Sequence, residues 1–519
     1  MIKYSIARIR HFNGKRAIFF SERNVKMARK EQIYSLFPHS WCTDNSSREL
    51  YSDEVSKLIA VKPSQLQLDF MEMEYYNFIH FGVNTFYGRE WGDGTEDIRR
   101  FNPKKLDTDQ WCSVLKDTGS KGIIITAKHH DGFCLFDTKY TDHNVMNSPF
   151  KKDIVKLLSE SCRKYGMKLG IYLSPWDRHE STYGTEKYND YFVSQLKELC
   201  TNYGEIFTFW FDGACGEGKN GKKQIYDWKR YYSVIRELQP GAVISICGPD
   251  VRWIGNEAGK VRKSEWSVIP AEKDANSKIM ENSQQSESGV KKLMSISERD
   301  EDLGSREVLR NFDNLVFKPA EADVSANIGW FFTKNIFKRA AKRRTAEKLA
   351  QIYFSSVGGN ASLLLNVPPN KKGLIDKSNV AQLRKFTELI NAPFKKEVKN
   401  YTAELVAEEP QKAPEALFEK GEGYLLKTGE KGVRLCFESA VDISAVTLKE
   451  NLAFSQRVEE FEVYTALNGG DFNCVYKGTV IGSKRIVVFD NPVKADELVI
   501  IPTSSRSDPV LRDIRVYMN

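Results

Sequence analysis

The chain lacks the features that mark membrane proteins, disulfide-rich proteins and cysteine-based metal sites. No apolar segment in its 519 residues approaches the roughly 20 residues that span a bilayer. The nine cysteines are scattered, odd in number, and form no CxxC pair. Cys162, Cys200 and Cys247 lie in apolar patterns, so we predict that they are small core residues. Neither a disulfide framework nor a cysteine metal site is expected.

No single sign of charge dominates the composition. The 77 Lys and Arg residues face 69 Asp and Glu residues, which leaves a net charge of +8. Such a balance predicts a mixed surface, and no nucleic-acid partner is expected. With 41% hydrophobic and 12% aromatic residues, the chain can bury a large core, so general disorder is also excluded.

The N-terminus shows no secretion signal. Its first residues, MIKYSIARIRHFNGKRAIFF, are basic but have no apolar core of roughly 7–15 residues and no small-residue cleavage site. Residues 1–60 are polar and without a clear period, so they are predicted to be an irregular N-terminal extension. The compartment of the protein is left open by these residues.

Nucleotide-binding and nucleophile-elbow motifs are missing as well. The chain has no P-loop, no GxGxxG in a strand–helix setting and no GxSxG. No cofactor is expected.

The chain does have a regular alternation of apolar strands and amphipathic helices between about residues 75 and 395. Strands are predicted at 75–82, 122–130, 168–177, 206–212 and 242–250, with a late one at 362–370, and helices at 111–119, 153–166, 191–204 and 228–238. Continuous apolar strands are typical of a parallel sheet that is buried on both faces. At least five such units in a row favour a (β/α)₈-like, TIM-type barrel, which we assign to residues 61–395.

A different pattern follows at residues 396–519. A charged, proline-containing linker leads into short, alternating apolar runs separated by turn residues. In one of them Phe461, Val463 and Thr465 share a face. We predict a C-terminal all-β sandwich, for which simple packing against the barrel is one role.

Polar and aromatic side chains gather where the barrel strands end, which is where such barrels carry their active sites. The strand ends supply His80, His129, His130, Asp131, Tyr172, Trp176, Asp177, Trp210 and Asp212, and a later loop supplies Asp250, Arg252, Trp253, Asn256 and Glu257. Asp212 ends the run FTFWFD, and because an unpaired buried carboxylate is costly, it is expected at a turn or at the mouth of a site.

Each of these residues has a purely structural explanation when it is taken alone. His80 could be a hydrogen-bonded core histidine, and Asp212 could start a turn. His129 and His130 suggest a metal, but neighbours on a strand point to opposite faces, so no metal site is expected. Two carboxylates with aromatics and neutral histidines suit glycoside cleavage, which needs one nucleophile and one acid/base.

Five segments in order resemble the α-L-fucosidases of glycoside hydrolase family 29. They are NFIHFGVNTFYGREWGDG, KHHDGFCLFDTKYT, IYLSPWDRH, TFWFDGA and RWIGNEAG, and the late GGNASLLLNVPPN matches too. The resemblance covers roughly residues 63–390. It implies a (β/α)₈-like catalytic domain followed by a β-sandwich, and fucosylated glycans as substrates. Because discoidin-like modules are often attached to such enzymes, carbohydrate binding by the sandwich is as plausible as simple packing against the barrel.

The resemblance also implies roles for individual residues. Asp212 matches the nucleophile, and Glu257 matches the acid/base of the subgroup that prefers α-1,3/1,4-linked fucose on Lewis-type glycans. The fucose pocket is matched by His80, Glu90, Trp91, His129, His130, Tyr172 and Trp210, and less closely by Trp330. The implied mechanism is retaining, with the two carboxyls about 5–5.5 Å apart. Family members commonly leave the cytoplasm, which implies an extracellular or periplasmic location.

The chain departs from the family pattern at two positions. Asn327 stands where arginine is common, and Thr333 stands where histidine is common. These departures bear on Trp330 and the leaving-group side of the pocket.

Three other functions stay open at this stage. The chain could be a non-catalytic fucose-binding protein, or a barrel hydrolase with another sugar or linkage specificity. A metal-dependent hydrolase that uses His129, His130 and Asp131 is the third.

Overall fold

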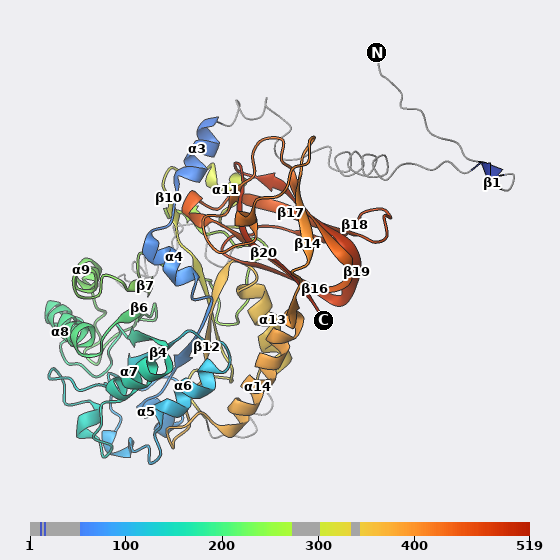
Figure 1. The fold of residues 1–519 in the computed structure, drawn as a ribbon. Helices are drawn as coiled ribbons and strands as arrows, with labels where there is room; N and C mark the ends of the chain where they lie inside the picture. The colour runs from blue at the N-terminus through green and yellow to red at the C-terminus, as the bar shows by residue number, and fades with distance from the viewer. Residues whose placement is uncertain (1–10, 13–14, 17–51, 272–300, 334–342) are drawn as a thin grey trace.

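The computed structural model describes residues 11–12, 15–16, 52–271, 301–333 and 343–519, and it places a barrel beside an antiparallel β-structure (Figure 1). The barrel sheet has eight strands, all paired in parallel. In spatial order they are β7 (Val243–Ile246), β6 (Ile206–Phe211), β5 (Lys168–Leu173), β4 (Gly122–Lys128), β3 (Tyr75–Ile79), β12 (Ala361–Asn366), β11 (Ala320–Ser325) and β8 (Arg252–Trp253). A bridge from Ser245 to Val251 nearly closes the ring, so the predicted barrel is confirmed.

Helices cover the outside of the sheet. The main ones are α6 (Thr108–Lys116), α7 (Ile154–Tyr165), α8 (Glu186–Asn202), α9 (Trp228–Leu238), α13 (Ala346–Ser356) and α14 (Lys377–Asn391). Side chains of Asp107, Asp153 and Asp227 cap the N-termini of α6, α7 and α9. Gly166 ends α7 with φ 62°, a left-handed conformation that glycine adopts without strain. The apolar faces pack into the main core, which includes the predicted Cys162, Cys200 and Cys247.

Shorter elements connect these units. They are β1 (His11–Phe12), β2 (Lys15–Arg16), α3 (Ser52–Ala60), α4 (Gln65–Met71), α5 (Val83–Tyr87), β9 (Val268–Pro270), α11 (Arg306–Leu309) and β10 (Leu315–Phe317), with 3₁₀ turns at Ile98–Arg100, Val145–Asn147, Ala392–Phe394, Glu415–Leu417 and Leu452–Phe454. Most of the predicted N-terminal extension lies outside the described residues. Its last nine residues form α3 instead of irregular chain, because Leu58 is buried in a small apolar cluster with Val268 and Leu452.

The C-terminal part is an antiparallel β-structure, as predicted. Its strands are β13 (Lys396–Glu397), β14 (Tyr401–Val406), β15 (Tyr424–Leu425), β16 (Gly432–Glu450), β17 (Val458–Ala466), β18 (Asn473–Gly478), β19 (Arg485–Ser505) and β20 (Val510–Met518). Phe461, Val463 and Thr465 are buried together, which confirms their shared face. The two apolar runs at 485–490 and 497–502 belong to one long strand, β19, because register shifts against β16 let it continue past Pro492.

Ion pairs join this sandwich to the start of the barrel. Glu74, just before β3, bonds Lys449 (3.1 Å) and Lys484 (2.8 Å). Burial acts to raise the pKa of the Glu74 carboxyl, but the lysines outweigh it and lower the pKa to about 2. Nearby, Glu72 bonds Arg512 at 2.8 Å. Within the described residues, no helix is long and apolar enough to cross a membrane.

A buried ion pair lies under the strand ends of the barrel. Lys128, the last residue of β4, is fully buried, and its Nζ lies 2.9 Å from Asp177 Oδ2. Its ammonium also lies over the rings of Tyr188, Tyr191 and Phe192, at 5.1–5.6 Å from their centroids. Burial acts to raise the pKa of the Asp177 carboxyl, but Lys128 and backbone N–H donors outweigh this effect and lower the pKa overall.

We expect Lys128→Met to lower the free energy of unfolding by about 3–5 kcal/mol, because the Asp177 carboxylate would remain buried without its cation. Chemical unfolding at neutral pH measures this loss, with Lys385→Met as the control, since the exposed Lys385–Glu388 pair contributes at most about 1 kcal/mol. Because the pKa of Asp177 is lowered on folding, its contribution is present at neutral pH and is lost as the pH falls. Equal effects of the two substitutions would contradict the prediction.

Candidate active site

Asp212 lies just after β6, and both of its carboxylate oxygens have donors. The backbone N–H of Ala214 donates to Oδ1 at 2.7 Å, and the hydroxyl of Tyr172 donates to Oδ2 at 2.9 Å. The Asp212 side chain is 25% exposed to solvent. Burial raises the pKa of Asp212, and these two donors partly offset the rise. The carboxylate therefore starts a turn and at the same time stays partly exposed at the carboxyl end of β6.

A stack of rings forms one wall beside this carboxylate. Trp210 is stacked on Tyr172 at 5.4 Å, and Tyr172 is stacked on His129 at 5.6 Å. His80 lies 5.8 Å from His129 and 5.1 Å from Trp330, measured between ring centroids. The ring planes are nearly parallel, at 11° between His129 and Tyr172 and 21° between Tyr172 and Trp210, and all three rings are buried.

The pocket histidines are neutral. Burial lowers the pKa of His80 and of His130 to about 3, and it also lowers the pKa of His129 well below its usual value. Nδ1 of His80 lies 2.9 Å from Asn366 Oδ1, whose amide nitrogen already donates to the Trp330 carbonyl. Because that partner is an acceptor, His80 Nδ1 carries the proton and Nε2 is left as an acceptor.

His130 is oriented in the same way. Its Nδ1 lies 2.7 Å from the hydroxyl of Ser174, which itself donates to the Trp176 carbonyl. Nδ1 therefore donates, and the unprotonated Nε2 lies 3.8 Å from Asp212 Oδ2. Two acceptors that face each other at this distance suit a hydroxyl donor between them.

The expected opposite orientation of His129 and His130 is wrong. Their ring centroids are only 4.1 Å apart, because β4 ends at Lys128 and the strand alternation stops before both residues. Asp131 does not join them: its two oxygens accept from Asn84 and from the N–H of Phe133, both at 2.8 Å. Across the described residues, no three His, Cys, Asp or Glu side chains form a group that could hold a metal ion.

Glu90 and Trp91 come from the loop after α5. Trp91 is 53% exposed and meets His130 edge-on at 5.4 Å. Glu90 Oε2 accepts from the backbone N–H groups of Trp330 (2.7 Å) and Phe331 (3.3 Å). A Cβ at Gly329 would displace the Glu90 carboxylate, so glycine leaves room for this contact. Glu90 thus joins two loops that are far apart in the sequence.

Glu257 lies in the exposed loop after β8. The indole N–H of Trp330 donates to its Oε2 at 3.3 Å. Partial burial raises the pKa of the Glu257 carboxyl, and the nearby charge of Asp212 raises it further. Glu257 and Asp212 therefore influence each other across one pocket; the separation of 5–5.5 Å stays a prediction.

The substituted turn at Asn327 keeps Trp330 in this arrangement. Asn327 is buried, and the Arg344 guanidinium, just before α13, donates to the carbonyls of Ser325 (2.6 Å) and Asn327 (3.3 Å). Arg344 therefore supports this turn through two carbonyl groups.

Two buried acids on β11 were missed by the sequence analysis. Glu321 Oε1 accepts from the Trp210 indole at 2.6 Å, and its Oε2 accepts from the Tyr76 hydroxyl. Asp323 Oδ1 accepts from the Trp253 indole at 2.8 Å. Burial raises the pKa of Glu321 to about 7. The only signal in the sequence is the period-2 alternation of alanine with acid in AEADVS.

The two carboxyls and the eight pocket residues matched to the family are thus in contact, directly or through one another. Asp250 does not join them, because its carboxylate bonds Arg236. The carboxyls of Asp212 and Glu257 lie in different environments. The Asp212 carboxylate accepts hydrogen bonds from Tyr172 and Ala214 beside the aromatic rings, whereas Glu257 lies in an exposed loop and accepts from the Trp330 indole. Such a pair can divide nucleophilic and acid/base work between them.

Comparison with known proteins identifies the family of the chain. The model of the Alpha-L-fucosidase family matches residues 33–392, a range that begins inside the predicted extension. Alpha-L-fucosidase 1 of Arabidopsis thaliana is 36% identical over 88% of this chain and 87% of its own. A crystal structure of a Bacteroides ovatus protein assigned as an α-L-fucosidase has a TM-score of 0.77 and 38% identity, and covers 92% of this chain and 77% of its own. A Ruminococcus gnavus GH29 fucosidase, solved in complex with fucose, has a TM-score of 0.73 and 28% identity over 88% of this chain and 95% of its own.

Proposed function

The chain belongs to the α-L-fucosidase family of glycoside hydrolases, and from this premise we propose that it is a retaining exo-enzyme that removes α-1,3/1,4-linked fucose from Lewis-type glycans. The observation that carries the proposal is the division of labour between two carboxyls at one pocket. Asp212 is held by Tyr172 and Ala214 and faces the pocket, while Glu257 lies exposed at its mouth.

In the first step, an Asp212 oxygen attacks the anomeric carbon of fucose, and the bond from that carbon to the glycosidic oxygen breaks. Glu257 gives its proton to the departing oxygen. In the second step, water attacks the same carbon, its proton passes to the Glu257 carboxylate, and the bond to Asp212 breaks. The raised pKa of Glu257 favours the protonated form that the first step needs.

The remaining residues bind the sugar. The acceptor nitrogens of His80 and His130 suit fucose hydroxyls, and the stacked rings of Tyr172 and Trp210 suit the apolar side of the sugar. Trp330 lies beside His80 and Glu257, where it would border both the fucose and the leaving group. An exposed Glu257 and an exposed Trp91 leave room at the mouth for a branched glycan.

Three measurements test this proposal. Wild-type protein is incubated with a Lewis-type trisaccharide and with an α-1,2-fucosylated lactose, and proton NMR follows the first anomer released. We expect α-fucose first, and release from the trisaccharide at least tenfold faster. A first product of β-fucose would overturn the retaining mechanism, and faster release from the α-1,2 substrate would overturn the linkage preference. Aryl glycosides of other sugars test the alternative of another sugar specificity.

A further prediction concerns Tyr172. We expect Tyr172→Phe to move the acidic limb of the kcat/KM profile to higher pH. The lost hydroxyl lowers the pKa of Asp212 in the wild type, and only ionised Asp212 is nucleophilic. Loss of orientation is also expected to cost on the order of tenfold in kcat/KM. Tyr76→Phe is the matched control, because its hydroxyl bonds Glu321 instead. An unmoved limb would contradict the role given to Tyr172.

A further inference from the structure

The C-terminal sandwich holds the barrel segment that follows Glu257. We propose that Gln456, a residue of the sandwich, is a positioning residue for the acid/base Glu257, a role that rests on the proposed function. The contact runs through residues 262–267, where the Glu257 loop returns to the body of the protein.

The Glu257 loop is tied at its base by one buried carboxylate. Glu265 is fully buried and bonds Arg252 on β8, where the loop begins. It also bonds Arg262, where the loop ends, with 3.1 Å between Nη1 and Oε2. Arg262 in turn donates to the Ile254 carbonyl at 3.2 Å. The position of Glu265 therefore sets both ends of the loop that carries Glu257.

The sandwich binds the backbone on both sides of this carboxylate. Gln456 has no exposed surface; its Oε1 accepts from the Ser267 N–H at 2.8 Å, and its Nε2 lies 3.4 Å from the Glu265 carbonyl. The Thr479 hydroxyl donates to the Lys263 carbonyl at 2.6 Å. These contacts come from two separate turns of the sandwich, before β17 and after β18.

A barrel residue, Asn360, makes a third contact with this backbone and is itself hydrogen-bonded by the sandwich. Asn360 Nδ2 donates to the Glu265 carbonyl at 2.8 Å, and its Oδ1 accepts from the Ser483 N–H of the sandwich at 2.7 Å. The Glu265 carbonyl therefore receives donors from both domains. The backbone around Glu265 is fixed more firmly than the exposed loop beyond it.

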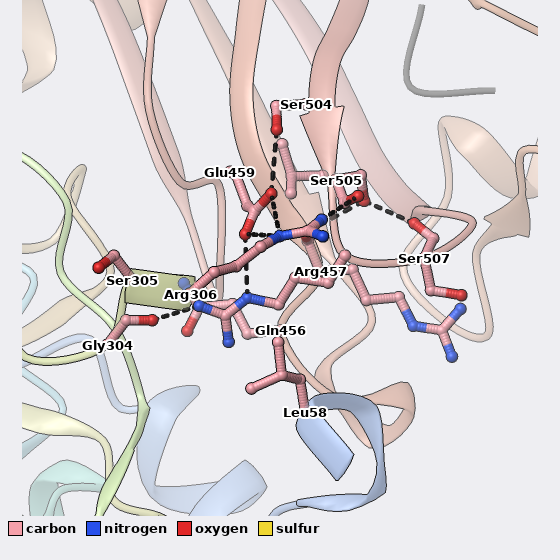
Figure 2. A network of polar contacts seen from close by, with 12 residues as sticks. Leu58, Gly304, Ser305, Arg306, Gln456, Arg457, Glu459, Ser504, Ser505 and Ser507 are labelled. Carbon is pink, nitrogen blue, oxygen red and sulfur yellow. Dashed lines mark hydrogen bonds and ion pairs between the residues drawn. The ribbon is translucent and has the colours of Figure 1, made fainter. Parts of the chain in front are cut away.

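Buried charge fixes the same face of the sandwich against Trp266. The Arg506 guanidinium lies 3.7 Å from the centroid of the Trp266 ring. Glu459 bonds both Arg506 (3.4 Å) and Arg306 (2.8 Å), and Arg306 also donates to the Ser505 carbonyl. Figure 2 shows Arg306 reaching Glu459 close to Gln456. This network holds the domains together, whereas Gln456 and Thr479 contact the loop base itself.

The alternative role of the sandwich, carbohydrate binding, has less support. Among its described residues, the large apolar side chains that are more than a third exposed are Leu425, Phe454 and Val488. Only one is aromatic, and Arg457 lies over its ring at 5.8 Å. The contacts instead favour packing that acts on the active site.

The test uses full-length Gln456→Met, which keeps the side-chain length but removes both hydrogen bonds. Two substrates separate the roles: a Lewis-type trisaccharide, whose leaving group needs a proton from Glu257, and a dinitrophenyl fucoside, whose leaving group does not. We expect kcat/KM on the trisaccharide to fall on the order of tenfold or more, with a change below about twofold on the aryl fucoside. Ser504→Ala is the control, because Ser504 bonds Glu459 in the same interface without touching residues 262–267.

Equal losses on both substrates, or no loss on either, would overturn the proposal. If Gln456→Met does not fold, as judged by its melting temperature, the same comparison is made with Thr479→Val, which removes the 2.6 Å bond to the Lys263 carbonyl together with a long 3.5 Å contact from Arg485. Failure of the proposed function is distinguishable, because wild-type protein and Glu257→Gln are assayed alongside. If Glu257→Gln shows no dependence on the leaving group, the acid/base assignment itself is wrong.

Discussion

Asp212→Ala is expected to lower the rate of fucose release by at least about 10³-fold, even from an aryl fucoside with a good leaving group. Without this carboxylate no covalent intermediate forms, and a better leaving group cannot compensate for a missing nucleophile. Because the histidines and the ring stack keep their own partners, fucose is expected to bind the variant still. Stopped or steady-state release assays, together with calorimetric binding of fucose, measure both effects.

Added azide makes this test sharper. With Asp212 removed, azide can attack the anomeric carbon from the vacated side, so the product should be β-fucosyl azide, with inverted configuration. Glu217→Gln is the control, since Glu217 is an exposed carboxylate on the same loop and should leave the rate within about twofold. Fucose release by Asp212→Ala at the wild-type rate would remove Asp212 from the mechanism and restore the binding-protein or metal-hydrolase alternatives.

Glu257→Gln is expected to slow release from the trisaccharide by about 10²–10⁴-fold, the usual contribution of general acid catalysis. The loss should be much smaller in kcat/KM for a dinitrophenyl fucoside, whose oxygen leaves unprotonated. Because the pKa of Glu257 is raised, the wild-type enzyme should lose activity on the basic side as Glu257 gives up its proton. That basic limb should disappear in the variant. Here azide attacks the fucosyl-enzyme, so the azide product should retain the α configuration.

Glu90 is the main alternative to Glu257 as the acid/base residue. Its pKa is also raised by burial, and it lies close enough to Glu257 for their charges to interact. Its Oε2 is engaged by two backbone N–H groups, which suits a structural acceptor more than an acid. If Glu90→Gln, and not Glu257→Gln, produced the dependence on the leaving group, the two roles would have to be exchanged.

The barrel was predictable wherever its strands are apolar on both faces. β3, β4 and β6 are continuous apolar runs, because helices cover one side and the barrel interior the other. β11 was not predicted as a strand because its inward positions hold the acids Glu321 and Asp323. These acids accept hydrogen bonds from indole and phenol groups on other strands. A hydrophobicity pattern cannot show donors that arrive from elsewhere in the chain.

The sequence allowed the candidate residues to be named, but it did not allow the contacts between them to be predicted. Strand ends and motif order placed Asp212, His80 and Tyr172 at one end of the barrel. The bond from Trp330 N–H to Glu90 joins residues 240 positions apart, and no local pattern encodes such a pairing. The neighbouring histidines were misjudged for a local reason, because the exact residue at which β4 ends decides where both rings point.

The ion pairs at Glu74 have a consequence for how the chain is made. Synthesis runs from the N-terminus, so Glu74 leaves the ribosome 410 residues before its partner Lys484. Until then Glu74, just before the first barrel strand, lacks one of the two lysines that bond it. A chain cut short before Ser483 would contain every barrel strand, yet it would lack Lys484, which bonds Glu74, and Ser483, which bonds Asn360. The hydrolase therefore becomes complete only when nearly the whole chain has been translated, and truncated chains are natural substrates for cellular proteases.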